Sequence, residues 1–469
     1  MNKRIITIFL LASLFSSNSV VFSAVPKSKS ISKQPAKQLK ATVTDYRLEY
    51  LNTDWWDKFH DPILKGYILK AMNANHDLKT ATLRVAEFQA MFRESFGKEL
   101  PELGIGTSFS RQKTSDNVAF GDLKIPEYTQ NAYGLPLTAS YELDLWRKNR
   151  EKTLSVAKEL EVVRYDEKAA YISLSAATAT VYFNIVKTDK LIQMQKNIID
   201  IRKKVLELMK IKNANGLCPT TDVILSDKAL TEAQSGLNDL QKYDTLLLNQ
   251  LAVFLGESVD SAGSLKRASL DDLNLHEDLP AKVKSDIVRE RPDILKAEAQ
   301  LQKSKIDVNI ARKDFLPDIG ITGQFGFNSN DFSKTFDWDS YIAGLGINLT
   351  HSLFAGGQKK ARLKIKKVQY EELLQNYQKT ILASFQEVND SLACIKHDGQ
   401  KDKDNISRLK AEENNLDLMT YKHKEGALAY LDLLQYKERV LVLKQEQMQS
   451  KAACLIDSLS LYKAVGGKL

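Results

Sequence analysis

The chain has 469 residues, of which 43% are hydrophobic and 27% charged, so it is long enough for one large domain or two to three ordinary ones. Its 67 basic and 59 acidic residues give a net charge of +8, a small excess that argues against the concentrated positive surface of a nucleic-acid-binding protein. With 21 Gly, 10 Pro and 3 Cys, it is neither collagen-like nor a disulfide-stabilised scaffold.

The N-terminus predicts a secretory signal peptide at residues 1–23, with cleavage near Ser23 or Ala24. Lys3 and Arg4 precede an apolar stretch that runs from residue 5 to 15. The alternative is an N-terminal membrane anchor, but the apolar stretch is too short for a comfortable span. Since no cysteine lies near the cleavage position, we expect no lipid anchor there. Residues 24–44 hold five lysines and two prolines, which predicts a flexible linker. Beyond it we expect no apolar run of about 18 residues, and therefore no further membrane-spanning helix.

A first repeat unit is predicted over residues 45–256. It opens with a helix over roughly 71–100, and two strands follow within about 101–146. Every second residue from 133 to 145 is apolar, so each strand has one apolar face, while Glu142 and Asp144 lie on the polar face and are expected to line an interior. Strands of this length can cross a bilayer at a tilt. Pro136 is unexpected in a paired strand, and we expect a bulge or a later strand start there.

A very long helix follows at 147–215, since residues 150–215 contain neither Gly nor Pro. About 69 helical residues extend roughly 100 Å. A turn at Asn215, Gly216 and Leu217 leads into a helix at 221–256. Two shorter helices of about 30 and 36 residues, placed end to end, would match the long one, which predicts a helical cylinder about 100 Å long.

The same pattern returns in a second unit at 285–465, after a linking segment at 257–284. At a shift of 216 residues, Leu100 and Pro101 align with Leu316 and Pro317. The second unit then has strands within about 317–354, a long helix at 358–425, a turn at Glu425, Gly426 and Ala427, and a helix at 430–465. The chain is therefore two copies of one structural unit.

Four strands cannot close a membrane barrel, and helices of this length have no soluble partner within the chain. Three copies would solve both problems with about twelve strands. The predicted fold is thus mostly α, with a trimeric twelve-stranded β-barrel continuous with a long α-helical tunnel. A soluble, half-buried sheet is the simpler alternative.

At this point the sequence resembles the TolC family of outer-membrane efflux channels, in the branch that serves resistance-nodulation-division drug pumps. The resemblance rests on an ordered set of motifs: Asp54-Trp55-Trp56, Asn75-His76-Asp77-Leu78, Tyr141-Glu142-Leu143-Asp144-Leu145-Trp146, Glu290-Arg291-Pro292-Asp293-Ile294, Phe315-Leu316-Pro317 and Leu353-Phe354-Ala355-Gly356-Gly357. It implies a homotrimer in the outer membrane that extends into the periplasm. The trimer would be a passive exit duct for drugs and small molecules delivered by an inner-membrane pump and a periplasmic adaptor. A type I secretion channel for proteins and a periplasmic helical scaffold are the alternatives.

The resemblance also implies where the functional residues lie. Adaptors would contact the two turns, at Asn215, Gly216, Leu217, Glu425, Gly426 and Ala427. The gate would lie just past them, at Thr221, Asp222, His423, Leu431, Asp432 and Gln435. The family's gate-forming Tyr and Arg are His423 and Leu428 here, so we expect a gate closed by Leu431 and by packing rather than by salt bridges. Asp222 could instead be only a helix-start acid, and His423 only a solvated surface side chain.

No pattern in the sequence predicts catalysis, a cofactor or a metal ion. The six histidines form no metal-binding motif, and no phosphate-binding loop is present. Cys218, Cys394 and Cys454 are scattered, which indicates structural roles. Two basic clusters follow the strands, and they could meet anionic lipid headgroups of the outer membrane or be solvated helix faces. Their members are Arg147, Lys148, Arg150 and Lys152 in the first unit and Lys359, Lys360, Arg362, Lys364, Lys366 and Lys367 in the second.

Overall fold

The computed structural model describes residues 55–115, 119–120, 123–124, 128–273, 283 and 288–467. The chain divides into two units, residues 1–50 and 51–469, and every described residue belongs to the second. The predicted signal peptide, the predicted linker and Asp54 lie outside the described residues, as does most of 274–287 within the predicted linking segment.

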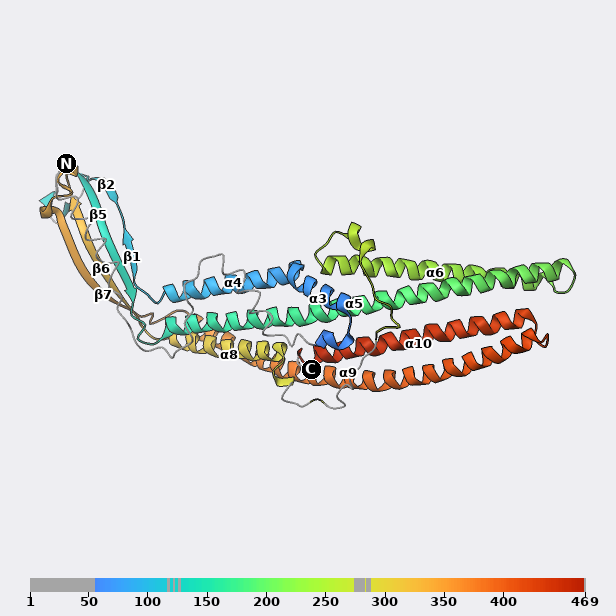
Figure 1. Ribbon diagram of the computed structural model, residues 1–469. Coiled ribbons are helices and arrows are strands. Elements are labelled where there is room, and N and C mark those ends of the chain that lie inside the picture. Colours follow the sequence, from blue (N-terminus) through green and yellow to red (C-terminus); the bar gives the residue numbers. More distant parts are fainter. Residues whose placement is uncertain are drawn as a thin grey trace. The chain divides into compact units, whose positions relative to one another are not determined.

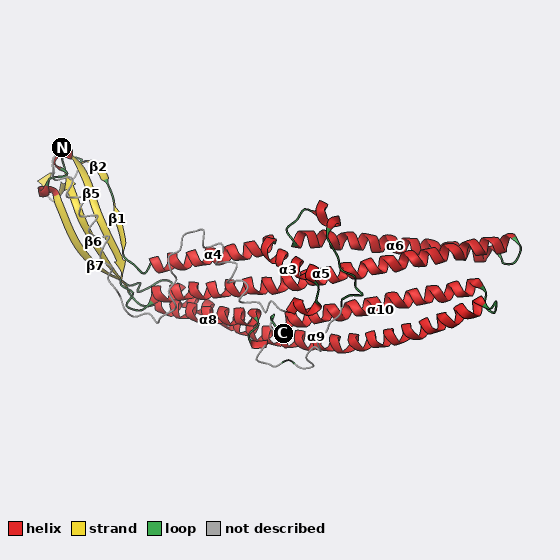
Figure 2. Cartoon of the chain, in the orientation of Figure 1, coloured by secondary structure: helices red, strands yellow, loops and turns green. Residues whose placement is uncertain are grey.

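The helices form two matching sets, which confirms the predicted internal repeat (Figures 1 and 2). The first set is α4 (His76–Gly97), α5 (Lys148–Ala214) and α6 (Thr220–Phe254), and the second is α8 (Pro292–Lys313), α9 (Gln358–Lys424) and α10 (Tyr430–Ala464). Corresponding helices have equal lengths of 22, 67 and 35 residues. A shift of 210 residues therefore superposes the α5–α6 hairpin on the α9–α10 hairpin.

The helices lie side by side in a fixed order. On the side of the sheet, α4 packs on α5, α5 on α8, and α8 on α9. Towards the hairpin tips, α6 packs on α5, α5 on α10, and α10 on α9 (Figure 1). The two long helices thus belong to both groups, and each runs past two shorter helices.

The first predicted helix is two helices, so the expectation of one helix over 71–100 is wrong. α3 (Pro62–Ala74) ends and α4 begins at Asn75, whose extended backbone breaks the helix. The Asn75 side chain accepts hydrogen bonds from the amides of Asp77 and Leu78 at 2.9 and 3.2 Å. The break is therefore an N-cap, in which the side chain satisfies two amides at the start of the new helix.

Helix α5 is the centre of the core and packs against α3, α4, α6, α8 and α10. It carries an 18-residue window with a mean hydropathy of 1.3, of which 61% is buried. By length and composition this window could span a membrane, so the expectation of no apolar run beyond the signal is wrong. Its burial among five other helices accounts for its apolar composition.

The strands form one antiparallel sheet. β1 (Glu102–Ile105) and β2 (Ser108–Lys113) both pair with β5 (Thr129–Glu142), which pairs with β6 (Asp318–Ser329), which pairs with β7 (Tyr341–Thr350). β3 (Ala119–Phe120) and β4 (Leu123–Lys124) form a separate pair. Counting β1 and β2 as one interrupted strand, the main sheet has the four strand positions that the alternation predicted.

The strand register puts the apolar residues of the four positions on one face. Leu137 pairs with Ile105 on one side and Phe325 on the other. This face is uncovered, with Leu345 80% and Ile347 70% exposed. So large an exposed apolar surface requires an apolar environment.

Pro136 lies inside the continuous strand β5, so neither the expected bulge nor a later strand start is present. Gly106 donates its amide hydrogen bond to the Pro136 carbonyl at 3.0 Å, which puts the proline nitrogen on the same side, facing the break between β1 and β2. The register is the same on both sides of that break. Opposite lies Gly326, where a Cβ would clash with the Leu135 carbonyl oxygen. Proline has no N–H to donate, and the sheet accommodates Pro136 because its nitrogen faces the break between β1 and β2. A glycine, Gly326, lies opposite it on the other side.

Asp144 does not face an interior as expected, because it caps α5. Its carboxylate oxygens accept hydrogen bonds from the amides of Asn149 at 3.1 Å and Arg150 at 2.9 Å. These two amides lie in the first turn of α5, where helix geometry leaves them without backbone partners. Glu142 remains exposed on the polar face of the sheet.

Candidate functional site

The two hairpin tips have the same backbone geometry. Gly216 has a φ of +68° and Gly426 one of +75°, a left-handed conformation that glycine adopts without strain. At the first tip the Leu217 amide donates to the Lys212 carbonyl at 2.8 Å, and at the second the Ala427 amide donates to the carbonyl five residues earlier at 2.8 Å. Each long helix thus ends in a Schellman motif that satisfies its last carbonyl groups.

A polar side chain three residues before each glycine closes the turn. Asn213 donates from Nδ2 to the Cys218 carbonyl at 2.9 Å. At the equivalent position, His423 bonds through Nδ1 to the Leu428 carbonyl at 2.8 Å, and its ring lies 5.5 Å from the Tyr430 ring. Because the acceptor is a carbonyl, Nδ1 carries the proton. His423 is half-buried, so the alternative of a solvated surface histidine is wrong.

The side chains at the outermost positions differ between the tips. Leu217 is 70% exposed at the first tip. Glu425 and Ala427 are exposed at the second, next to Lys422 and Lys424 in the last turn of α9. Both tips have a lysine at the equivalent position, Lys212 and Lys422, so the tips differ in that the second has Glu425 and Lys424 in addition. Asn215 turns back on its own helix, with Nδ2 donating to the Ile211 carbonyl at 2.7 Å.

Apart from His423 in the last turn of α9, the predicted gate residues lie in the first two turns of α6 and α10. Asp222 and Asp432 occupy equivalent positions in the first turn of each helix, where a carboxylate interacts favourably with the helix dipole. Asp222 is half-buried and Asp432 exposed, and Leu431 is half-buried. Thr221 and Gln435 are exposed. Among the described residues, the hydrogen bonds that close each tip lie within its own hairpin, so each half of the predicted gate is held by its own hairpin.

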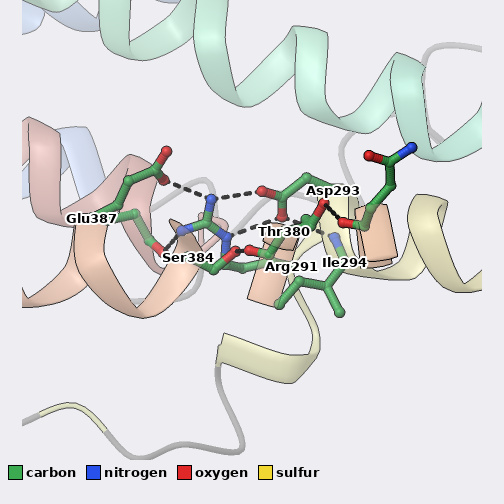
Figure 3. Close-up of polar contacts among 8 residues, drawn as sticks. Arg291, Asp293, Ile294, Thr380, Ser384 and Glu387 are labelled. Carbon is green, nitrogen blue, oxygen red and sulfur yellow. Dashed lines mark hydrogen bonds and ion pairs between the residues drawn. The ribbon is translucent and has the colours of Figure 1, made fainter. Parts of the chain in front are cut away.

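The Arg-Pro-Asp motif fastens three helices together. The Arg291 side chain is buried between the start of α8 and α9, and it binds Asp293 at 2.7 Å and Glu387 at 2.7 Å (Figure 3). Its Nη1 donates to the Ala464 carbonyl, the last residue of α10, at 2.6 Å. These two carboxylates, bonded to Arg291 directly, keep its pKa raised even though burial opposes the charge. The motif is therefore a structural junction.

The Trp-Trp motif is also structural. Trp56 is 1% exposed, and the Trp55 ring stacks on Tyr462 with centroids 4.3 Å apart. Nearby, Asp61 caps α3 and also accepts a 2.5 Å hydrogen bond from the Tyr182 hydroxyl of α5. These contacts tie the start of the described chain to α5 and to the end of α10.

The remaining polar features are the possible metal ligands, the cysteines and one hollow. In the part of the chain that the structure describes, no three His, Cys, Asp or Glu side chains are grouped to hold a metal ion. Cys218 contacts the Met209 carbonyl at 3.5 Å, and all three cysteines are free. A hollow of 730 Å³ opens at the base of the sheet, where its lining includes Glu102, Glu142 and Asp318.

Comparison with known proteins gives one family. A model described as "Outer membrane efflux protein" matches residues 68–257 and 284–467. "Pyoverdine export outer membrane protein OpmQ" of Pseudomonas aeruginosa is 27% identical over 415 residues, which cover 88% of this chain and 87% of that protein. "Probable outer membrane lipoprotein SilC" of Salmonella typhimurium is 24% identical over 456 residues, 94% of this chain and 92% of that protein.

Solved structures agree on the fold. The CmeC outer membrane channel of Campylobacter jejuni superposes with a TM-score of 0.82 at 24% identity and covers 89% of this chain and 88% of that one. The helical repeat and the sheet described above therefore have the same fold as that structure.

Proposed function

The chain belongs to the outer membrane efflux protein family and is the outer-membrane channel of a tripartite efflux system, and on this premise we propose that three copies form one exit duct. Family members are channels and not enzymes. The duct would carry small molecules received from an inner-membrane pump of the resistance-nodulation-division type through a periplasmic adaptor. The names of the relatives, which refer to pyoverdine and to efflux, support a small-molecule cargo.

The single observation that carries this proposal is the uncovered apolar face of the sheet. Among the described strands, β1 and β2 lie at one edge of the sheet and β7 lies at the other, and open sheet edges are not tolerated in a bilayer. Closure by neighbouring copies would pair them and turn the apolar face towards lipid. With four strand positions per chain, three copies give a barrel of about twelve strands.

For the tips, we propose a division between docking and gating. Residues 215–217 and 425–427 protrude at the hairpin ends, which suits contact with the adaptor. Asp222 and Asp432, repeated threefold around an axis, would form acidic rings that attract cations, and Leu431 would seal the pore by excluding water. No arginine lies within either tip to link these acids, which supports a gate closed by packing.

For export, we propose a cleaved signal at 1–23, a linker at 24–44, and no lipid anchor. Although one relative is described as a lipoprotein, lipidation needs a cysteine near the cleavage position, and the first cysteine of this chain is Cys218. The proposed repeats are 45–256 and 285–465, joined by 257–284.

The experiment that tests the duct is single-channel conductance in a planar bilayer, with the trimer followed on an unboiled gel. A detergent-extracted trimer that gives small, cation-selective steps is expected. A monomer that needs no detergent and gives no steps would contradict the proposal. Leu431→Thr, which gives the second tip the residue of the first, should make cells leak large antibiotics. Lys437→Arg, a conservative change at an exposed position of α10 outside the predicted gate, should not.

A further inference from the structure

The side of α9 that turns away from α8 carries a row of lysines. Lys366, Gln369 and Leu373 line a hollow shared with Lys303 and Asp307 of α8, which fixes the inward side of α9. At 100° per residue, Lys360, Lys364 and Lys367 lie on the opposite side, spaced i, i+4 and i+7, and all three are exposed. Among the described residues, these three lysines have no ion pair. Glu371 follows one turn later and ends the basic row.

Helix α4, at the other end of the row of helices, carries acids on its free side. Val85 and Leu78 face α5 and are buried. The opposite side presents Leu83, which is 69% exposed, followed by Glu87 and Glu94, spaced seven residues apart. The Glu94 side chain is 67% exposed and reaches only Lys98 of its own helix, at 2.8 Å.

Contacts between the helices give the relative heights of the two free sides. Ser95 of α4 bonds to Thr153 of α5, Ser155 of α5 bonds to Asp307 of α8, and Asp314 of α8 pairs with Arg362 of α9. Following these levels with equal rise per residue, Glu94 lies at the height of residue 368. It is therefore next to Lys367 and just over one turn from Lys364. Leu83 lies within one turn of Leu382, which is 72% exposed.

Rotation about an axis parallel to the helices leaves these heights unchanged, so the two free sides would meet in register between neighbouring copies. We propose that the α4 side of one chain packs against the α9 side of the next, with Glu94 facing Lys367 and within reach of Lys364, and Leu83 against Leu382. The seam rests on the proposed function for its threefold axis. It also continues the strand seam, since α4 leads into β1 and β7 leads into α9. The occupant of the lysine row is therefore a second copy of this chain, and not the lipid headgroups that its sequence also suggested.

The test is a charge exchange across the seam. Lys364→Glu with Lys367→Glu places three acids together, and we expect a roughly tenfold rise in the monomer-to-trimer ratio on unboiled gels and in native mass spectrometry. Adding Glu94→Lys to the same chain should restore the trimer. Lys305→Glu is the matched control, because Lys305 is exposed at a similar height on α8, a helix with neighbours on both sides.

Each outcome decides a separate point. If Lys364→Glu with Lys367→Glu leaves the trimer unaffected, the seam is overturned but the duct is not. If that variant keeps its trimer and also binds vesicles containing phosphatidylglycerol less tightly, the seam is likewise overturned, because the lysines then face lipid. A wild-type chain that forms no trimer would overturn the proposed duct along with the seam. Loss of the trimer with no rescue by Glu94→Lys would overturn the assigned pairing.

Discussion

Helices α5 and α9 have the same length and the same place in their repeats, yet they differ sharply in burial. Both have 67 residues, but α5 buries 23 side chains and α9 only four. The difference arises because α5 has helices on several sides, whereas α9 ends the row. The two repeats therefore have the same backbone, but α5 has more neighbouring helices than α9 does. An uncovered helix in a duplicated fold marks where a neighbouring copy fits.

The largest expected effect is a difference in stability between substitutions at one equivalent pair of positions in α5 and α9. Ile172 of α5 is 6% exposed, and Leu382, at the matching position 210 residues later, is 72% exposed. Ile172→Ala should lower the free energy of unfolding by about 2–5 kcal/mol because it leaves a cavity. Leu382→Ala should change the stability of a single chain by less than about 0.5 kcal/mol. Denaturant unfolding of both variants measures this, and equal losses in the two would contradict the assigned difference.

The next effect tests whether the two tips share their backbone requirement. Gly216→Ala and Gly426→Ala each force a side chain into the left-handed region, which costs about 1–2 kcal/mol. A Cβ added at either glycine would have no atom within 4 Å, so the loss is one of backbone strain alone. Thermal unfolding should show similar decreases in Tm, and Gly399→Ala, inside α9, should show none. A decrease at only one tip would contradict the shared geometry.

A smaller effect concerns the side chains that close the tips. His423→Asn places at the second tip the residue type that Asn213 provides at the first. The asparagine Nδ2 should retain the hydrogen bond to the Leu428 carbonyl. His423→Leu removes the donor and should lower stability by about 1 kcal/mol. Hydrogen exchange of the amides at 425–428 would show the opening locally. If His423→Asn opens the tip as far as His423→Leu does, the equivalence of the two side chains is wrong.

The smallest effect is the pH dependence that Asp457 of α10 gives to the stability of the second hairpin. Burial, with Asp398 nearby, raises the pKa of Asp457 to about 6, whereas the equivalent residue of the first hairpin is the buried Leu247. A raised acid pKa means that the folded chain keeps a proton that the unfolded chain releases, so stability falls as pH rises from about 4 to about 6. Asp457→Asn should raise Tm at pH 7.5 and leave it unchanged at pH 4. A gain at both pH values would point to another cause.

The sequence was sufficient for the features that depend on local periodicity. The first long helix follows from the absence of Gly and Pro, the second from the repeat with Gly399 as its one glycine, and the four strand positions follow from alternation. Three features were missed, and the first of them depends on a partner distant in the chain. Pro136 is tolerated because of Gly326 and the break opposite it. The break at Asn75 shows only as a capping residue within an apparently continuous helix. The His423 contact crosses a turn whose geometry is set by Gly426.

The junction around Arg291 has a mechanical consequence. It holds α9 at Glu387, and from there to the end of the helix at Lys424 the rigid rod extends roughly 55 Å. If α9 pivots at the Arg291–Glu387 ion pair, a tilt of about 5° displaces the far end of the helix by about 5 Å. An aperture at the far end can therefore widen by the width of a side chain while the ion pairs at the pivot stay intact.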